Sequence, residues 1–368
     1  MKTYDQFVRT LILEGGNVEI DGHEATRIDL TQTDRTQIIK SIGESLDEMN
    51  KSFRKMFGIH IWSPDLFNSH LFLSGSAFHF FDKSITNEVF RKHKPTVGDI
   101  DTQVDKNLMK SMDEFLTKNK GKKFKNMTLF GFKKSPGQFI SLWNEEKTGL
   151  NIQVDFEFVD FHKGSPTEWS QFSHSAMWSD IVEDIKGVFH KYALRALTAR
   201  TLRDAVVIRG KTEKKVKMPI KDLAFSVVQG LRQRYRPVTD SRGKQLFDDG
   251  LPVYKEIPTN ESSYDTNVDT IFSALIGNMP TKQEKNKFYS FIGIIEILDQ
   301  KYTPSEKKSF INAYADLLWG KGAQKLVKGN PDEDYKIKLK SFKKAIDIMS
   351  LQEDKSITLM RQNFYRNY

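Results

Sequence analysis

Apolar residues recur at helical spacing in residues 35–57, RTQIIKSIGESLDEMNKSFRKMF. The apolar residues that share one side of this stretch are Ile38, Ile39, Ile42, Leu46, Met49 and Phe53. A spacing of three and four residues places side chains on one face of a helix, which buries that face against a core. The pattern therefore predicts an amphipathic helix early in the chain.

From residue 69 to residue 162 the pattern is mainly that of strands. SHLFLSG (69–75) and DIDTQVD (99–105) predict two strands, and LMKSMDEFLTKNK (108–120) predicts a helix that ends at Gly121. Three further β-rich segments, joined by the turn-like sequences KKSPG and EEKTG, follow at 126–132, 138–144 and 150–161. This order predicts an α/β (α+β) domain in which helices flank a mixed sheet.

After residue 162 the pattern becomes mostly helical. DIVEDIKGVFHKYALRALTAR (180–200) predicts one long amphipathic helix, and RGKTEKKVKMPIK (209–221) predicts an exposed loop or hairpin. Residues 238–268 are rich in Gly, Pro, Asp and Ser, which is typical of a linker or long loop. Further helices are expected at 283–300, 304–320 and 336–352. A chain of 368 residues is long enough for two domains, and we place them at 1–184 and 185–368, the second mainly helical.

The net charge of +9 is unevenly distributed between these two halves. Residues 1–184 contain 23 Lys and Arg against 27 Asp and Glu, a net of −4, and residues 185–368 contain 34 against 21, a net of +13. Clustered Lys and Arg displace counterions from a phosphate backbone. The second half is therefore the expected contact for RNA or tRNA, and a solvated lysine-rich surface is the alternative.

Cysteine is absent, which excludes disulfides, thiolate metal ligands and thiol nucleophiles. The first residues lack the apolar core of a signal peptide, and no segment offers the ~20 apolar residues that span a bilayer. We therefore expect a soluble, cytoplasmic protein that does not contact a membrane. The oligomeric state does not follow from the sequence.

Acidic residues occupy alternating positions of two predicted strands. Asp99 and Asp101 share one face of their strand, because successive side chains of a strand point to opposite sides. In LNIQVDFEFV apolar and polar residues alternate, so Asp155 and Glu157 share the polar face of the later strand. Carboxylates at close range repel one another unless cations neutralise them, and Mg²⁺ prefers oxygen ligands. The pattern predicts that Asp99, Asp101 and Asp155 form a site for Mg²⁺ or Mn²⁺.

The segments LSGSAF and GDIDTQVD, followed by a later strand with VDF, resemble the polymerase-beta-like nucleotidyltransferase superfamily. The motif of that superfamily is Gly-Ser, Asp-x-Asp and a third Asp on a neighbouring strand. The early segment LEGGNVEIDGHEATRIDL also resembles the N-terminal part of nucleotidyltransferase-like proteins encoded by tailed bacteriophages. The resemblance covers roughly residues 12–200, and it implies a nucleotidyltransferase-type fold and, for a phage protein, action in the host cell cytoplasm.

The resemblance also implies roles for individual residues. Gly75 and Ser76 match the turn that holds the triphosphate, close to the start of a helix. Asp99 and Asp101 match two metal ligands that connect the catalytic ions to the nucleotide. Asp155 matches a third carboxylate, which helps to bind the catalytic metal and to activate the attacking hydroxyl.

The sequence departs from the family in one respect. Between Ser76 and Asp99 lie 22 residues, where the family usually has about half that number. The inserted segment FDKSITNEVFRKHKP carries basic residues that either reach the β- and γ-phosphates or belong to a solvated loop: Lys83, Arg91, Lys92 and Lys94. A helix after the third Asp contacts the nucleotide in the family, which makes Lys186 and Lys191 candidates for nucleotide binding.

Three further features leave two interpretations open. FSVVQGLRQRYRP, with Arg232, Arg234 and Arg236, suits a phosphate backbone or is an ordinary basic helix end. Glu157 is either a base next to the metal site or a solvated strand residue. His190 is more typical of helix packing than of catalysis.

These observations favour an enzyme, a metal-dependent nucleotidyltransferase. It would move NMP from an NTP to an acceptor hydroxyl on an RNA or tRNA end, a protein or a small molecule, with release of pyrophosphate. The alternative from another class is a catalytically inactive protein of this fold that binds nucleic acid or a phage assembly component. A structural α/β protein with acidic surface residues is the third hypothesis. The sequence identifies neither the nucleotide nor the acceptor.

Overall fold

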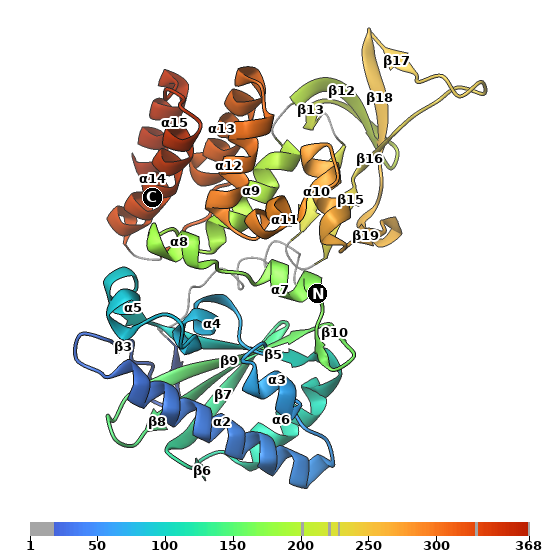
Figure 1. The fold of residues 1–368 in the computed structure, drawn as a ribbon. Coiled ribbons are helices and arrows are strands. Elements are labelled where there is room, and N and C mark those ends of the chain that lie inside the picture. Colours follow the sequence, from blue (N-terminus) through green and yellow to red (C-terminus); the bar gives the residue numbers. More distant parts are fainter. Residues whose placement is uncertain (1–17, 200–201, 220–221, 227–228, 328–329, 367–368) are drawn as a thin grey trace. The chain divides into compact units, whose positions relative to one another are not determined.

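The chain divides into two compact units, Met1–Asp184 and Ile185–Tyr368 (Figure 1). The structure is a computed structural model that describes residues 18–199, 202–219, 222–226, 229–327 and 330–366. Both units combine helices and strands, so the chain is a mixed α/β protein.

The first unit is built on a five-stranded mixed sheet with the strand order β5-β9-β8-β7-β6. Its strands are β5 (Asp99–Asp105), β6 (Lys123–Phe124), β7 (Met127–Ser135), β8 (Gln138–Glu145) and β9 (Asn151–Val159). The edge strand β5 runs parallel to β9, whereas all other neighbours are antiparallel. The expected strands at 99–105, 126–132, 138–144 and 150–161 are therefore confirmed within a few residues.

Helix α2 (Arg35–Phe57) covers the predicted residues. Asp34 caps its first turn by accepting hydrogen bonds from the N–H groups of Thr36 and Gln37, and Gly58 ends it with φ 77°. Its apolar side belongs to one core together with α6 (Met109–Lys118) and the apolar face of β5 and β9. That leaves the polar face of β5 and β9 on the other side of the sheet, because strand side chains alternate.

Several short elements complete the first unit. They are β1 (Glu19–Ile20), β2 (His23–Glu24), β3 (Ile28–Asp29), α3 (Pro64–Asn68), α4 (Gly75–Phe81), α5 (Asn87–His93), β4 (Thr96–Val97), η1 (Lys106–Leu108), β10 (Phe161–His162), β11 (Ser165–Pro166), α7 (Glu168–Ser173) and α8 (Trp178–Val182). Strand β1 pairs with β2, β3 with β4, and β10 with β11.

The prediction of a strand at 69–75 is wrong. Only Leu73 forms a bridge, to Thr102 of β5, and Gly75 begins helix α4 with φ 56°. The chain pairs with the edge of the sheet only around Leu73 and then turns into the helix, because a left-handed φ at Gly75 redirects the backbone. The inserted segment is likewise not a loop alone, since it contains the end of α4 and the whole of α5.

Arg35 fixes the inserted segment to α2. Its guanidinium is buried and donates to the carbonyl oxygens of four residues: His79, Phe80, Asp82 and Ile85. It also lies over the rings of Phe80 and Phe90, with centroid distances of 5.9 and 4.6 Å. One cation at the start of α2 therefore binds carbonyl groups at the end of α4 and in the segment that follows it.

The second unit contains more β-structure than the sequence predicted. Its strands are β12 (Leu202–Arg209), β13 (Thr212–Pro219), β14 (Leu223–Ser226), β15 (Gly230–Gln233), β16 (Tyr235–Pro237), β17 (Phe247–Asp248), β18 (Leu251–Glu256) and β19 (Tyr264–Asp265). They form a sheet with the order β13-β12-β18-β16, to which β17 adds by pairing with β18, and a sheet with the order β14-β15-β19. The unit thus contains two sheets in addition to its helices.

The helices of the second unit are α9 (Val188–Ala199), α10 (Val268–Ile276), α11 (Lys282–Phe288), α12 (Phe291–Lys301), α13 (Pro304–Trp319), α14 (Pro331–Ile348) and α15 (Lys355–Arg366), with η2 at Thr259–Glu261. Helix α9 packs against both α12 and α13. The helices expected at 283–300, 304–320 and 336–352 are confirmed, although the first is divided into α11 and α12.

Three expectations for the second half need correction. The single helix expected at 180–200 is divided into α8 and α9, because Asp184 has φ 51° and a helix cannot pass through that conformation. FSVVQGLRQRYRP is not a helix end, since most of its described residues belong to the short strands β14, β15 and β16. The linker or long loop expected at 238–268 contains β17, β18 and β19. Of the loop or hairpin expected at 209–221, the structure shows the hairpin, formed by the end of β12, the turn and β13.

Candidate metal and nucleotide site

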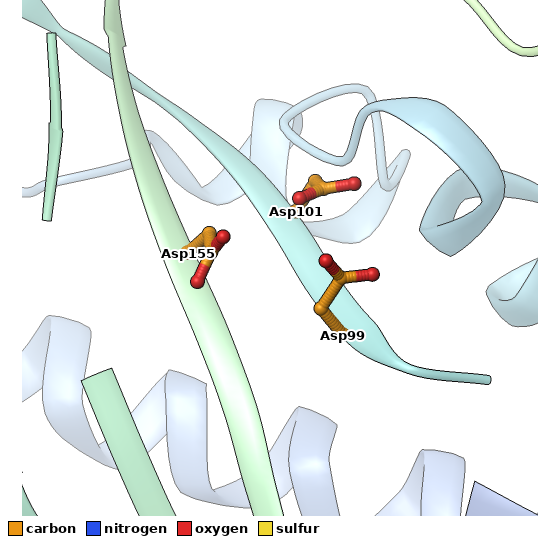
Figure 2. Close-up of side chains that lie close together, drawn as sticks. All are labelled: Asp99, Asp101 and Asp155. Carbon is orange, nitrogen blue, oxygen red and sulfur yellow. The ribbon is translucent and has the colours of Figure 1, made fainter. Parts of the chain in front are cut away.

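The three predicted aspartates meet on the polar face of β5 and β9. Asp101 and Asp155 are direct partners in the parallel register, and Asp99 lies two residues before Asp101 on β5. One carboxylate oxygen from each residue lies within 4.8 Å of the others (Figure 2). A divalent cation bound between these atoms would contact oxygen ligands from both strands.

The acids differ in their exposure to solvent. Asp155 is buried, with 6% of its surface accessible, whereas Asp99 and Asp101 are partly exposed. Burial, followed by the Asp99 carboxylate, raises the pKa of Asp155 well above its ordinary value, and the Glu157 carboxylate acts in the same direction. The side-chain amide of Gln153 opposes this shift by donating to both oxygens of Asp155, at 3.0 and 3.1 Å. The open side of the cluster is therefore that of Asp99 and Asp101.

Gly75 lies directly against this cluster. A Cβ atom at this position would be 2.9 Å from Oδ2 of Asp101, so a side chain would collide with the carboxylate, and the φ of 56° also favours glycine. The structure thus brings the predicted Gly75 turn and the acids together. Ser76, the second residue of α4, is partly exposed.

The Gly75 amide has a partner within the protein. Its N–H donates to the carbonyl oxygen of His174 at 3.1 Å. A phosphate at this turn would therefore use the amides of Ser76 and Ala77, which lie in the first helical turn, where N–H groups have no acceptor within the helix.

Sequence reasoning did not find the residues that hold this turn. Ser74 donates its hydroxyl to Glu157 Oε2 at 2.8 Å, and His174 Nε2 lies 3.8 Å from Glu157 Oε1. Glu157 is partly buried and hydrogen-bonded, so the interpretation as a solvated strand residue is wrong. The only signal in the sequence was the position of Glu157 on the same strand face as Asp155.

The basic residues of the inserted segment lie on or around α5. Arg91 and Lys92 are exposed at the last turn of α5, and Lys94 follows it. Lys83 lines a cavity of about 320 Å³ together with Asn68, Ser69, His70, Phe78, Phe81 and Asp82. A role for these cations in phosphate binding stays a prediction.

The remaining candidates belong to the second unit. Lys186 precedes α9 and Lys191 lies on it, so their part in nucleotide binding stays a prediction. His190 is buried on α9, where Nε2 bonds to the carbonyl oxygen of Phe288 at 2.9 Å, and burial lowers its pKa to about 4. The packing interpretation of His190 therefore fits the structure.

The three arginines of RQRYR have different surroundings. Arg232 donates to the carbonyl oxygen of Ile257 and to Ser262, and Arg234 forms an ion pair with Glu256 at 3.1 Å. Arg236 is exposed on β16, beside Lys255 of β18 in the strand register. Of the three, Arg236 is the residue best placed to contact a polyanion.

Comparison of the chain with models of known protein families found no match, and neither did comparison with curated proteins or with solved structures. No helix in the described parts of the chain is long and apolar enough to cross a membrane.

Proposed function

We propose that the protein is a metal-dependent nucleotidyltransferase. The observation that carries the proposal is the convergence of Asp99, Asp101 and Asp155 within 4.8 Å on two adjacent parallel strands. The Gly75 turn beside Asp101 supports it, because a triphosphate and its cation need a backbone turn and carboxylates at the same place.

The residues present fit Mg²⁺ or Mn²⁺. Three carboxylates offer only oxygen ligands. Burial and then the negative charge of Asp99 raise the pKa of Asp155, and a bound cation would neutralise that charge. Asp99, Asp101 and Asp155 would hold the ion. When bound, such an ion neutralises charge on the phosphates and favours deprotonation of the attacking hydroxyl.

The chain's own residues then account for the remaining chemistry. Asp99 and Asp101, on the open side of the cluster, would orient the triphosphate, and the first turn of α4 would accept its terminal phosphates. Asp155 would take the proton of the acceptor hydroxyl, because it is the buried carboxylate of the cluster, and a bound ion would make that hydroxyl more acidic. The new bond joins the acceptor oxygen to the α-phosphorus, the bond between this phosphorus and the bridging oxygen breaks, and pyrophosphate leaves.

Transfer of a labelled nucleotide tests the proposal. The full chain is incubated with each α-labelled NTP, Mg²⁺ or Mn²⁺, and total cellular RNA or protein, and the labelled product is identified. Asp155→Asn should keep NTP–Mg²⁺ binding within a few-fold while transfer falls by orders of magnitude, because Asp155 acts mainly in the transition state. Asp99→Asn should lose both NTP–Mg²⁺ binding and nucleotide transfer.

Asp105→Asn is the matched control on the same strand. Asp105 caps η1 by accepting from the N–H of Asn107 at 2.9 Å, a bond that an asparagine oxygen can also accept. This variant should transfer like the wild type. NTP–Mg²⁺ binding without transfer to any acceptor would instead favour the inactive, nucleic-acid-binding alternative.

A further inference from the structure

Ser74 connects the Gly75 turn to both strands that carry the acids. Its backbone N–H donates to the carbonyl oxygen of Asp101 on β5 at 3.1 Å. Its hydroxyl donates to Oε2 of Glu157 on β9 at 2.8 Å. A single buried serine thus bridges the two strands at the level of the cluster.

The hydroxyl of Ser74 does not form the hydrogen bond that a serine at this position usually forms. Ser74 is the N-cap residue of α4, where a serine side chain usually accepts from the N–H groups of the first turn, but no such cap bond is present. The side chain points instead to Glu157. The Ser74–Glu157 hydrogen bond therefore helps to fix the Gly75 turn to β9 and does not cap the first turn of α4.

This arrangement extends to the metal ligands through Gly75. The turn that Ser74 anchors places Gly75 so close to Asp101 that a Cβ would be 2.9 Å from Oδ2. A shift of the turn by a few tenths of an ångström would change the space in which the Asp101 carboxylate lies. Glu157 also lies 3.8 Å from His174 Nε2, and the carbonyl oxygen of His174 accepts from the Gly75 N–H.

We propose that Glu157 is a positioning residue, which acts through Ser74 to hold the Gly75 turn at the distance from Asp101 that a metal-bound triphosphate requires. This inference rests on the proposed nucleotidyltransferase function. Glu157 would not contact the substrate. Removing its bond to Ser74 should therefore weaken the affinity for the metal–nucleotide complex more than the affinity for the metal alone.

The chain offers a matched control for this pair. Ser41 on α2 donates its hydroxyl to Oε1 of Glu145 at the end of β8, at 2.7 Å. Ser41 and Ser74 are both buried, and both bonds join a serine to a glutamate of the same sheet. Ser41→Ala therefore removes an equivalent hydrogen bond that has no connection to the Gly75 turn.

The test compares Ser74→Ala, Glu157→Ala, Glu157→Gln and Ser41→Ala in the full chain. Affinity for Mn²⁺ alone and for Mn²⁺–ATP is measured, together with hydrogen exchange of the amides at 74–78. Ser74→Ala and Glu157→Ala should bind Mn²⁺ within about threefold of wild type but Mn²⁺–ATP about tenfold more weakly, as expected for one lost hydrogen bond. Their 74–78 amides should exchange faster. Glu157→Gln keeps an acceptor oxygen, so its Mn²⁺–ATP affinity and its exchange at 74–78 should match those of wild type. Ser41→Ala should change neither the affinity nor the exchange.

Two results would overturn the proposal. The first is Mn²⁺–ATP affinity and exchange at 74–78 in Ser74→Ala that match those of Ser41→Ala. The second is a Glu157→Gln variant as defective as Glu157→Ala, because the charge of Glu157 and not its bond to Ser74 would then be responsible. If the wild type binds no Mn²⁺–ATP, the proposed function fails, and with it the role of Glu157 toward nucleotide. Faster exchange in Ser74→Ala would then show only a structural anchor.

Discussion

Asp155 combines a buried carboxylate with acidic neighbours, and this combination opposes folding when no cation is bound. Burial and the Asp99 carboxylate raise its pKa, so Asp155 binds more protons in the folded protein than in the unfolded chain above the ordinary aspartate pKa of ~4. The contribution of Asp155 to the free energy of unfolding in metal-free buffer should therefore fall as pH rises from ~4 through the raised pKa.

Asp155→Asn removes this charge with little change of shape. We expect the variant to melt a few degrees above wild type at pH 7 in EDTA, and the difference to vanish near pH 4, where the wild-type carboxyl is also protonated. Saturating Mn²⁺ without nucleotide should reduce or reverse this difference, because the wild type, with three carboxylates, gains more stability from binding the ion than the variant with two. Scanning calorimetry with Asp105→Asn as the control measures this. A lower melting temperature for Asp155→Asn at pH 7 in EDTA would contradict the account of Asp155.

At the residue scale the sequence predicted the acids but not their supports. Alternation along a strand was enough to place Asp99, Asp101 and Asp155 on polar faces. The register that makes Asp101 and Asp155 partners depends on contacts between distant segments, which the motif resemblance suggested and no local pattern contains. The bond from Ser74 to Glu157 has no local signal, because it joins residues 83 positions apart.

Among the elements, α2 supports the site indirectly through Arg35. The buried guanidinium satisfies carbonyl groups at the end of α4 and beyond, and α4 is the helix that begins at Gly75. Arg35→Met should lower the free energy of unfolding by about 3 kcal/mol, because buried carbonyl groups lose charged donors. Arg35→Lys should lose less of the free energy of unfolding than Arg35→Met but should remain less stable than wild type, since an ammonium group cannot reach the same set of acceptors.

Urea unfolding of the full chain measures this effect, with Arg91→Met on the exposed side of α5 as the control. The control should change the free energy of unfolding by less than ~0.5 kcal/mol. An Arg35→Met variant as stable as Arg91→Met would show that Arg35 does not hold the inserted segment.

Element prediction succeeded where periodicity was long and failed where strands were short and polar. Helix α2 has several turns of regular spacing and a capping aspartate, so its bounds matched. Strand β13 has the sequence TEKKVKMP, whose lysines are typical of an exposed edge and conceal its strand character. Strands β14, β15 and β16 have three or four residues each, too few for an alternating pattern to be distinguished from a helix end.

At the scale of the whole molecule, the charge difference between the halves makes the second unit the expected site for RNA. The full chain should bind single-stranded RNA with an affinity that falls steeply as salt increases. Arg236 and Lys255 are exposed neighbours on β16 and β18, and replacing both by Gln should reduce the salt slope by about 1 to 1.5, since each phosphate contact contributes about 0.7.

The control replaces two exposed lysines of the first unit, Lys110 and Lys133, by Gln. This variant has the same net charge as the first, so an effect of overall charge would appear in both. Fluorescence anisotropy between about 50 and 200 mM salt measures the slopes. Equal slopes for the two variants, or no binding of RNA at low salt, would contradict a contact through β16 and β18.

The central claim is that three aspartates of the first unit form one divalent metal site, and direct measurement of Mn²⁺ binding tests it most closely. Electron paramagnetic resonance of free Mn²⁺ during titration gives the affinity and the number of bound ions without any assumption about substrate. Asp101 is the partner of Asp155 in the strand register and lies against Gly75, so Asp101→Asn should lower Mn²⁺ affinity at least tenfold, while Asp105→Asn on the same strand should bind like wild type. Equal Mn²⁺ binding by wild type, Asp101→Asn and Asp105→Asn would contradict the metal site.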